Sequence, residues 1–389
     1  MKKSRPDTLK VLIVAAEASS SLYAQRLLEY WKSQNQKVEA FGVGSRSMEK
    51  LGFDCIGRSE ELAVVGLQEV IRHWGLIKNT FHSLIAEAEK RKPDIVLLLD
   101  YPDFNLRLAK QLKKRGFEIV YYISPQIWAW RESRVNIIQK WVDKMLVLFP
   151  FEKDFYAKHG VPVEFVGHPL LDEINDKYFD REYHDRHRAK YGILPTDVVL
   201  ALMPGSRTSE MRHHLQTQIE TAECLYHQYP NLKILLFVAP TFEVEEVRQM
   251  LPPLKIPLSL VKDEPFEMID LADVVLCASG TATLMVGLLQ KPMVIMYKMN
   301  RFSAWVAKRF VKSTSFFGMI NLILGREVVP EMFQEQAEPE LLVERLKPFI
   351  ENPELRRSMS EELAKAQSRL GDRGATIRVA QALEGCLTP

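Results

Sequence analysis

The chain has 389 residues, which at roughly 150 residues per domain predicts two domains or three. Hydrophobic residues make up 47% and charged residues 26%, so disordered, collagen-like and coiled-coil classes are excluded. Because 52 Lys and Arg stand against 50 Asp and Glu, the formal charge is only +2. Binding of nucleic acid through the overall charge of the protein is therefore not expected, and any function that needs positive charge must depend on a local group of basic residues.

The first segment of the chain predicts a strand followed by a helix. Its apolar patch, residues 11–16, is shorter than the core of a typical secretion signal. Leu22, Leu27, Leu28 and Trp31 then recur at helical spacing. No apolar run reaches the roughly 18–20 residues needed to span a bilayer. We therefore expect structure here rather than a signal peptide.

Short β-branched runs alternate with longer amphipathic stretches along the chain. The runs that predict strands are residues 10–15, 38–43, 95–99, 118–123, 144–148, 163–166, 198–203, 234–238, 258–260, 274–277 and 293–297. A charged stretch at 172–195 marks a domain junction, and a helical tail begins near residue 340. This alternation predicts two α/β domains with parallel, helix-covered sheets, whose ligands bind beyond the carboxyl ends of the strands.

Two common nucleotide-binding loops are absent. Residues 15–21, after the first predicted strand, contain no glycine, so the G-x-G-x-x-G dinucleotide fingerprint is missing. The chain also has no G-x-x-x-x-G-K-[ST] phosphate loop. These absences argue against a nicotinamide-dependent enzyme and a P-loop ATPase.

Neither cysteines nor histidines indicate a metal site. The four cysteines stand far apart, at Cys55, Cys224, Cys277 and Cys386, which favours neither zinc nor disulfides and fits a cytosolic protein. The nine histidines are scattered. For His184, His187, His213 and His214, which lie in polar stretches, solvated side chains are favoured over metal ligands.

Polar residues follow the predicted strand at 95–99. Asp100 stands directly after it, where an ionised carboxylate can accept a proton from a bound hydroxyl. For Asp103 and Asn105 a structural turn is favoured. The segment 124–131 follows the next strand and contains two tryptophans, which could stack on a sugar or fill the core.

Two loops of the second half have the composition of anion sites. Gly205, Ser206 and Arg207 follow the strand at 198–203, and a helix begins directly afterwards. Ser279, Gly280 and Thr281 form a similar loop after the strand at 274–277. Free N–H groups at a helix start suit phosphate, and Arg adds a fork of donors. Together the loops predict a diphosphate site that needs no metal.

Two stretches, 62–77 and 301–312, combine apolar and basic residues in a way that suits anionic lipid headgroups. From the residues alone, a core-facing apolar side with a solvated charged side is favoured. The candidate lipid contacts are Leu67, Val70, Ile71, Trp74, Phe302 and Trp305.

Nearly the whole chain from Val11 resembles the lipid-A-disaccharide synthase family. The segments that carry the resemblance are LAVVGLQEV (62–70), DYPDFN (100–105), SPQIWAWR (124–131), LFPFEK (148–153), VGHP (166–169), LMPGSR (202–207), ASGTATL (278–284) and NLILGRE (321–327), followed by Gln334 and Glu335.

The resemblance implies an α/β fold of two facing Rossmann-like, doubly wound domains of the glycosyltransferase B type. Residues 1–175 would bind the acceptor and lipid, 196–345 would bind the UDP-sugar, and 346–389 would cross back as helices. The implied reaction joins UDP-2,3-diacylglucosamine to 2,3-diacylglucosamine 1-phosphate with inversion, without metal or other cofactor. The implied location is the inner face of the cytoplasmic membrane, against its lipids, with no nucleic acid partner and a homodimer left open.

The resemblance also implies roles for single residues. Asp100 matches the family's candidate base, and Glu17 and Ser19 lie on the acceptor side. The residues that match the UDP-sugar side are Gly205, Ser206, Arg207, Ser279, Gly280, Thr281, Asn321, Arg326, Glu327, Gln334 and Glu335.

Three departures from the family pattern keep other functions open. The loop at 16–21 lacks both glycines and the Asp of G-E-x-S-G-D, Met285 replaces a Glu expected to hold the ribose hydroxyls, and Arg46 is displaced by one place. The alternatives are a divergent or weakened paralogue with another nucleotide-sugar or acceptor, and a non-enzymatic lipid or nucleotide-sugar binding protein. A UDP-N-acetylglucosamine epimerase would not explain 100–105 or 124–131.

Overall fold

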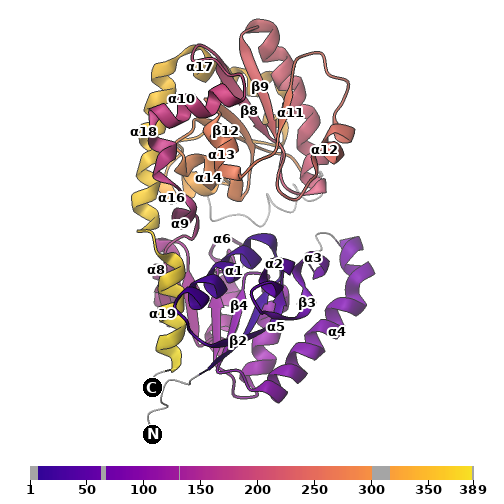
Figure 1. Ribbon diagram of the computed structural model, residues 1–389, viewed down its shortest axis with the longest axis vertical. Coiled ribbons are helices and arrows are strands. Elements are labelled where there is room, and N and C mark those ends of the chain that lie inside the picture. The colour runs from indigo at the N-terminus through magenta and orange to yellow at the C-terminus, as the bar shows by residue number, and fades with distance from the viewer. Residues whose placement is uncertain (1–7, 63–66, 131, 300–315, 388–389) are drawn as a thin grey trace. The chain divides into compact units, whose positions relative to one another are not determined.

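The computed structural model describes the backbone of residues 8–62, 67–130, 132–299 and 316–387. The chain forms two compact units, one of Met1–Asp172 with Leu370–Pro389 and the other of Glu173–Arg369. Each unit has one parallel sheet with helices packed around it (Figure 1). The predicted α/β class with two doubly wound sheets is therefore confirmed.

The sheet of unit 1 has seven parallel strands in the order β3-β2-β1-β4-β5-β6-β7. They are β1 (Leu9–Ala15), β2 (Val38–Gly44), β3 (Asp54–Arg58), β4 (Ile95–Leu99), β5 (Ile119–Tyr122), β6 (Lys144–Val147) and β7 (Val163–Phe165). Every residue of β4 is buried, as expected for a central parallel strand covered on both faces. The strand order reverses between β1 and β4, and such switch points are where open α/β sheets bind ligands.

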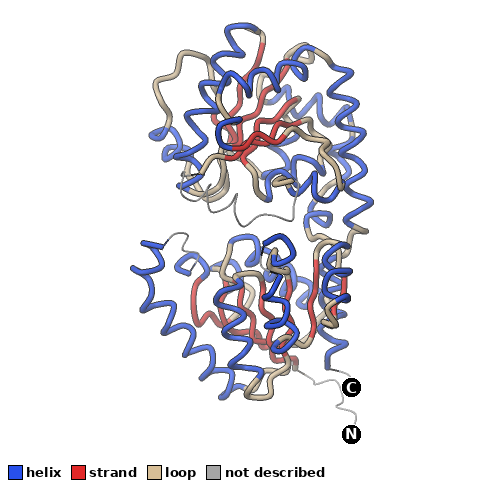
Figure 2. The backbone as a smooth tube through the Cα atoms, turned by 180° about the vertical axis from the view of Figure 1, so that it is seen from behind, coloured by secondary structure: helices blue, strands red, loops and turns tan. Residues whose placement is uncertain are grey.

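The helices of unit 1 cover this sheet, as the backbone tube in Figure 2 shows. They are α1 (Ala18–Ser33), α2 (Arg46–Glu49), α3 (Ser59–Leu62), α4 (Leu67–Arg91), α5 (Pro102–Lys113), α6 (Ile127–Trp130), α7 (Val135–Trp141), α8 (Pro150–Lys158) and α19 (Ala375–Leu387). Residues of α4, α5 and α7 share one apolar core with the sheet. Helix α19, although last in the chain, packs against α1 and β4. The strand-then-helix prediction for the first segment is confirmed by β1 and α1.

The sheet of unit 2 has six parallel strands in the order β10-β9-β8-β11-β12-β13. They are β8 (Val198–Met203), β9 (Leu232–Phe237), β10 (Ser259–Val261), β11 (Val274–Ala278), β12 (Met293–Tyr297) and β13 (Glu331–Phe333). Its order reverses between β8 and β11, and such switch points are where open α/β sheets bind ligands.

The chain passes from one unit to the other twice, within α9 and at the end of α18. The helices of unit 2 are α9 (Leu170–Glu173), α10 (Arg181–Lys190), α11 (Thr208–Gln228), α12 (Val244–Met250), α13 (Pro265–Asp270), α14 (Thr281–Leu288), α16 (Met319–Leu324), α17 (Pro339–Glu351) and α18 (Pro353–Leu370). Helix α17 packs against α11, β11 and β12.

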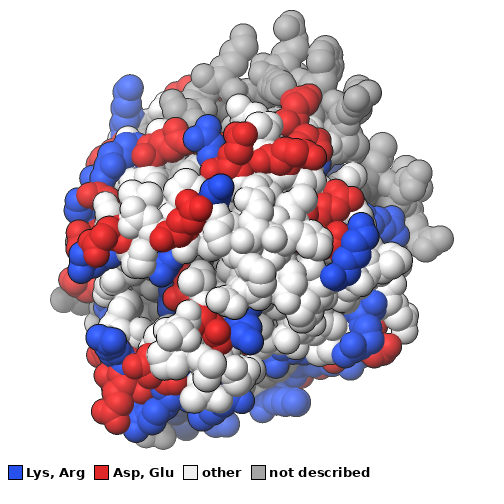
Figure 3. All heavy atoms as spheres, turned by 90° about the horizontal axis from the view of Figure 1, so that it is seen from above, with Lys and Arg blue, Asp and Glu red and all other residues white. Residues whose placement is uncertain are grey.

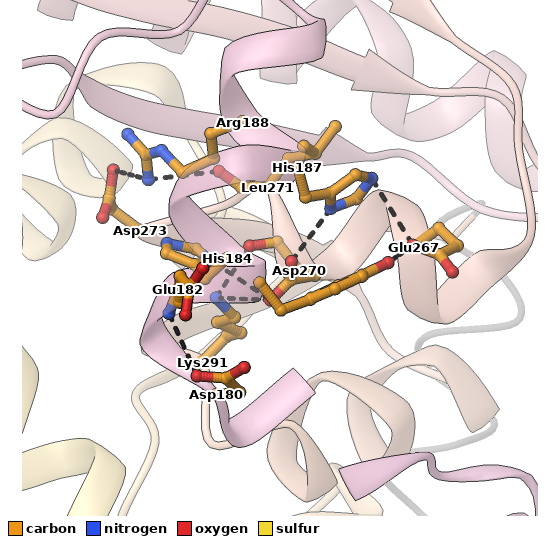
Figure 4. Close-up of polar contacts among 11 residues, drawn as sticks. Asp180, Glu182, His184, His187, Arg188, Glu267, Asp270, Leu271, Asp273 and Lys291 are labelled. Carbon is orange, nitrogen blue, oxygen red and sulfur yellow. Dashed lines mark hydrogen bonds and ion pairs between the residues drawn. The ribbon is translucent and has the colours of Figure 1, made fainter. Parts of the chain in front are cut away.

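The charged stretch after α9 is an ordered part of unit 2. Figure 4 shows α10 lying against α13, where His187 Nδ1 is 2.9 Å and His184 Nδ1 3.1 Å from the carboxylate of Asp270. Burial alone would raise the pKa of Asp270, but hydrogen bonds from both histidines and the charge of Lys291 hold it below its ordinary range. The expectation of a solvated His187 is wrong, because its side chain is buried against this carboxylate.

The surface carries no dominant charge in the view of Figure 3, where acidic and basic side chains alternate with uncharged areas. This mixture agrees with a formal charge of +2. None of the helices in the described ranges combines the length and the apolar composition needed to cross a bilayer.

Candidate functional site

In unit 1, the main chain turns sharply where β4 ends. Asp100 has φ 47° and Tyr101 has φ 46°, both in the left-handed region that side chains disfavour, at a cost of about 1–3 kcal/mol each. The Asp100 carbonyl accepts hydrogen bonds from the Tyr121 hydroxyl at 2.5 Å and from Asn105 Nδ2 at 2.8 Å. The Asp100 N–H donates to the carbonyl of Tyr122. These contacts hold the strained turn, which is the kind of strain that clusters at active sites.

The residues that follow Asp100 are structural, as the turn interpretation predicts. Pro102 begins α5, and the exposed Asp103 pairs with Arg134 at 2.6 Å. Asn105 is fully buried, and its Nδ2 also donates to the carbonyl of Leu99 at 3.0 Å. Sequence reasoning missed that Asn105 positions the backbone of Asp100, although the motif DYPDFN contains it.

The loop predicted to lie on the acceptor side begins beside this turn, because the register of β1 and β4 pairs Ala15 with Leu99. Glu17 caps α1, and its N–H donates to the Ser20 hydroxyl at 3.0 Å. Ser21 donates to the carbonyl of Ala15 at 2.9 Å. No residue of 15–21 has a positive φ. The serines therefore form an ordinary helix N-terminus without the glycines of the family pattern. Ser19, which is half-buried, lies in the first turn of α1.

The segment after β5 is tied to a buried carboxylate. Trp128 Nε1 donates to Glu152 at 3.3 Å, and the other oxygen of Glu152 accepts the N–H groups of Leu148 and Phe149 at 3.3 and 3.2 Å. Burial raises the pKa of Glu152 to about 7. Trp128 is therefore a packed, positioned side chain, whereas the side chains of 129–131 lie outside the described residues.

In unit 2, the loop after β8 needs its glycine. Gly205 has φ 130°, and a Cβ there would lie 2.4 Å from the carboxylate of Glu210. That carboxylate accepts the N–H of Ser206 at 2.9 Å and the N–H of Arg207 at 3.3 Å. The side chain of Arg207 is half exposed. The Glu210 carboxylate, in the first turn of the following helix, therefore holds the loop, and the Arg207 guanidinium lies at its exposed edge.

The loop after β11 starts next to it, because Cys277 pairs with Met203 in the sheet. Ser279 is half-buried, whereas Gly280 and Thr281 are exposed. Within the residues that the structure describes, a Cβ at Gly280 would meet no atom within 4 Å. The structure therefore places the two predicted anion loops side by side at the switch point of the second sheet.

The segment around α16 supports this edge of the sheet. Asn321 is fully buried, and its Nδ2 donates to the carbonyl of Val329 at 2.8 Å and to Glu331 at 2.7 Å. Its Oδ1 accepts the N–H of Val329 at 3.0 Å. These contacts give Asn321 a positioning role. The predicted site residues Arg326 and Glu327, which follow α16, are exposed.

Gln334 holds the backbone beyond β12. Its Oε1 accepts the N–H of Met299 and its Nε2 donates to the carbonyl of Met299, each at 3.1 Å. This two-way contact spans 35 residues of sequence, so spacing alone could not reveal it. The neighbouring Glu335 is exposed.

A buried histidine supports the first loop. His214 Nδ1 is 2.8 Å from the carbonyl of Pro204, and its Nε2 accepts the N–H of Lys298 at 3.0 Å. Burial lowers the pKa of His214. The expectation of a solvated His214 is wrong for this reason. Within the described part of the chain, no three His, Cys, Asp or Glu side chains are grouped as metal ligands.

The side chains of the candidate lipid contacts lie outside the part of the structure that is described. Leu67, Val70, Ile71 and Trp74 belong to α4, but their side chains lie outside the described residues, as do Phe302 and Trp305 entirely.

Solved structures share the fold over nearly the whole chain. A putative UDP-N-acetylglucosamine 2-epimerase from Listeria monocytogenes matches with a TM-score of 0.65 at 11% identity, covering 97% of this chain and 96% of its own. The kitacinnamycin glycotransferase matches with a TM-score of 0.62 at 14% identity, covering 99% and 100%. At these identities the likeness concerns the fold alone.

Sequence comparisons are more specific. The family model of lipid-A-disaccharide synthetase matches residues 11–382. The lipid-A-disaccharide synthase of Myxococcus xanthus is 35% identical over 98% of both chains. That of Nitrosococcus oceani is 37% identical over 93% of this chain and 92% of its own. This chain therefore belongs to the lipid-A-disaccharide synthase family of glycosyltransferases.

Proposed function

We propose that the chain joins UDP-2,3-diacylglucosamine to 2,3-diacylglucosamine 1-phosphate, which yields lipid A disaccharide 1-phosphate and UDP. The observation that carries the proposal is the strained turn at Asp100 and Tyr101, placed after β4 beside the switch point. An ionisable carboxylate on a backbone held by buried partners is suited to a general base.

In the proposed reaction, the 6-hydroxyl oxygen of the acceptor attacks the anomeric carbon of the donor. The bond from that carbon to the β-phosphate oxygen breaks, and UDP leaves with the electron pair. Asp100 takes the proton of the attacking hydroxyl. A single displacement inverts the α-linked donor to a β-linked product.

The leaving diphosphate gains negative charge as its bond breaks, and fixed positive groups lower that barrier. Glu210 already accepts the N–H groups of Ser206 and Arg207. We therefore assign the phosphates to the Arg207 guanidinium, the exposed Thr281 and the start of α14, whose peptide dipoles favour an anion. Because these groups supply the positive charge, we expect turnover to need no metal.

The test is formation of disaccharide from UDP-diacylglucosamine and radiolabelled acceptor by the purified full chain. We expect turnover that persists in EDTA and falls by about 10²–10⁴-fold in Asp100→Asn, the usual effect of losing a general base. Asp103→Asn is the matched control, because Asp103 is exposed and paired with Arg134. Equal activity of Asp100→Asn and the control would refute the proposal.

Met285 favours a second candidate, a divergent or weakened member of the family. It lies one helical turn after Thr281 in α14, where the resemblance implies a Glu that holds the ribose. Losing such a charge-assisted hydrogen bond weakens binding by about 1.5–3 kcal/mol. If the wild type is inactive and Met285→Glu is active with UDP-diacylglucosamine, the second candidate is the correct one.

Location at the inner face of the cytoplasmic membrane is part of the proposal, because both substrates carry acyl chains. It is tested by sedimentation with anionic liposomes without detergent. We expect the wild type to bind and Trp305→Glu to bind less. Equal binding would discard the 301–312 segment as a membrane contact.

A further inference from the structure

Four aromatic rings form a line at the carboxyl edge of β12 and β13. Tyr297 and Phe333 end these strands opposite each other, and their rings lie 6.4 Å apart at 15°. Phe317 stacks on Phe333 at 4.9 Å and 6°, and His214 lies 5.5 Å from Tyr297. The line thus runs from the histidine behind the first anion loop to a phenylalanine beside the second.

Phe317 is exposed although its backbone is firmly held. Its side chain is among the exposed large apolar ones, at 45%. The carboxylate of Glu331 accepts the N–H of Phe317 at 2.6 Å and that of Gly318 at 3.0 Å. Ser279 of the second loop directs its hydroxyl at the carbonyl of Phe317, 3.4 Å away. A rigidly positioned apolar ring therefore stands next to the proposed diphosphate site.

In the described part of the chain, the polar groups next to Phe317 already have partners. Glu331 binds the two N–H groups and the side chain of Asn321, and Asn321 has its remaining bonds to the backbone at Val328 and Val329. A pyrimidine base needs hydrogen-bond partners for its imide edge, because a buried polar edge without partners is costly. A hydrocarbon chain has no such need. As far as the described residues show them, the surroundings of Phe317 thus favour hydrocarbon over a nucleobase.

We propose that Phe317, backed by Phe333, contacts an acyl chain of the donor and selects acylated UDP-glucosamine over UDP-sugars without long chains. The inference rests on the proposed function. The acylated 2- and 3-positions are one and two carbons from the anomeric carbon, which a single oxygen joins to the β-phosphate. A diphosphate at Thr281 and the start of α14, two residues from the contact of Ser279 with Phe317, therefore brings the acyl chains near the ring of Phe317.

The experiment measures dissociation constants by calorimetry for three ligands: UDP, UDP-N-acetylglucosamine, and UDP-glucosamine with two hexanoyl chains, which stays monomeric. Phe317→Ser removes the apolar ring, and Phe317→Leu keeps an apolar side chain but cannot stack. Phe179→Ser is the matched control, because Phe179 is exposed at 43% in the 3₁₀ turn Asp176–Phe179, outside the proposed donor site.

We expect Phe317→Ser to weaken binding of the hexanoyl donor about tenfold, which is the effect of losing part of one buried aromatic side chain. Binding of UDP should stay unchanged, Phe317→Leu should retain most of the affinity for the hexanoyl donor, and the control should match the wild type. A similar loss for UDP would instead identify a nucleobase platform, and no loss for any ligand would leave Phe317 without a role. Either result overturns the inference. A wild type that binds none of the three ligands would refute the proposed function itself, and the inference with it.

Discussion

The buried carboxyl of Glu152 makes a quantitative prediction about unit 1. Glu152 lies in the first turn of α8, is almost fully buried, and accepts hydrogen bonds from Trp128, Leu148 and Phe149. The perturbation is Glu152→Gln, which keeps the shape and an acceptor oxygen but is uncharged at every pH. We expect the stability of the two proteins to respond differently to pH.

Burial raises the pKa of Glu152 from an ordinary 4.5 to about 7, against the hydrogen bonds that lower it. The folded chain therefore holds this proton at pH values where the unfolded chain has lost it. The free energy of unfolding consequently falls as the pH rises from 4.5 to about 7, and this contribution is constant above that pH. At about 1.4 kcal/mol per pH unit, the interval corresponds to roughly 3 kcal/mol.

The measurement is amide hydrogen exchange in β6, whose slowest amides report the opening of the unit 1 sheet. Comparing wild type with Glu152→Gln at the same pH cancels the intrinsic pH dependence of exchange. The stability of the wild type relative to the variant should fall by roughly 3 kcal/mol between pH 4.5 and 8. An unchanged difference over that range would show that the carboxyl titrates normally, and would refute the reasoning.

Three further substitutions test the described contacts of unit 2. Gly205→Ala should lower the affinity for UDP, measured by calorimetry, and lower the free energy of unfolding by about 1–3 kcal/mol. The cause is that alanine is strained at the positive φ of this position and that the new Cβ would meet Glu210. Unchanged UDP binding would contradict the assigned loop. Asp270→Asn should lower the free energy of unfolding in urea by about 3–5 kcal/mol, because it removes a buried carboxylate that pairs with His187 and with the largely buried Lys291. A loss below about 1 kcal/mol would show that these ion pairs are not needed. Asn321→Ala should lower the free energy of unfolding by roughly 2–4 kcal/mol in the same assay, because it leaves buried backbone groups without hydrogen-bond partners. An unchanged free energy of unfolding would contradict the positioning role and favour direct contact of Asn321 with the donor.

Strands with strong apolar runs were predictable to the residue. The segments 95–99, 198–203 and 293–297 agree with β4, β8 and β12 at both ends, because each is buried and followed by a polar or turn-forming residue. The edge strands β3 and β13 were not predicted. Both are short and contain charged residues, so their pairing depends on backbone hydrogen bonds that apolar periodicity does not report.

The candidate site was predictable where chemistry follows strand ends. Asp100 and the two anion loops were identified because parallel strands bring their carboxyl ends to one edge of a sheet. The residues that hold them were not. His214 meets Lys298 at a separation of 84 residues, and Tyr121 meets Asp100 at 21. Such contacts depend on the folded path of the chain, and a single sequence carries no sign of them.

The two units use different means to turn the chain at their switch points, and the difference follows from the roles proposed for them. After β4, the positive φ angles belong to Asp100 and Tyr101 and are held by buried hydrogen bonds. After β8, the positive φ belongs to Gly205 and costs no such strain. A base must keep one geometry to within fractions of an ångström throughout the reaction. The hydrogen bonds from Tyr121 and Asn105 hold the strained backbone of Asp100 in such a single geometry. The loop proposed to hold the leaving diphosphate needs no such strain, because glycine adopts a positive φ freely and the Glu210 carboxylate then fixes the N–H groups of Ser206 and Arg207.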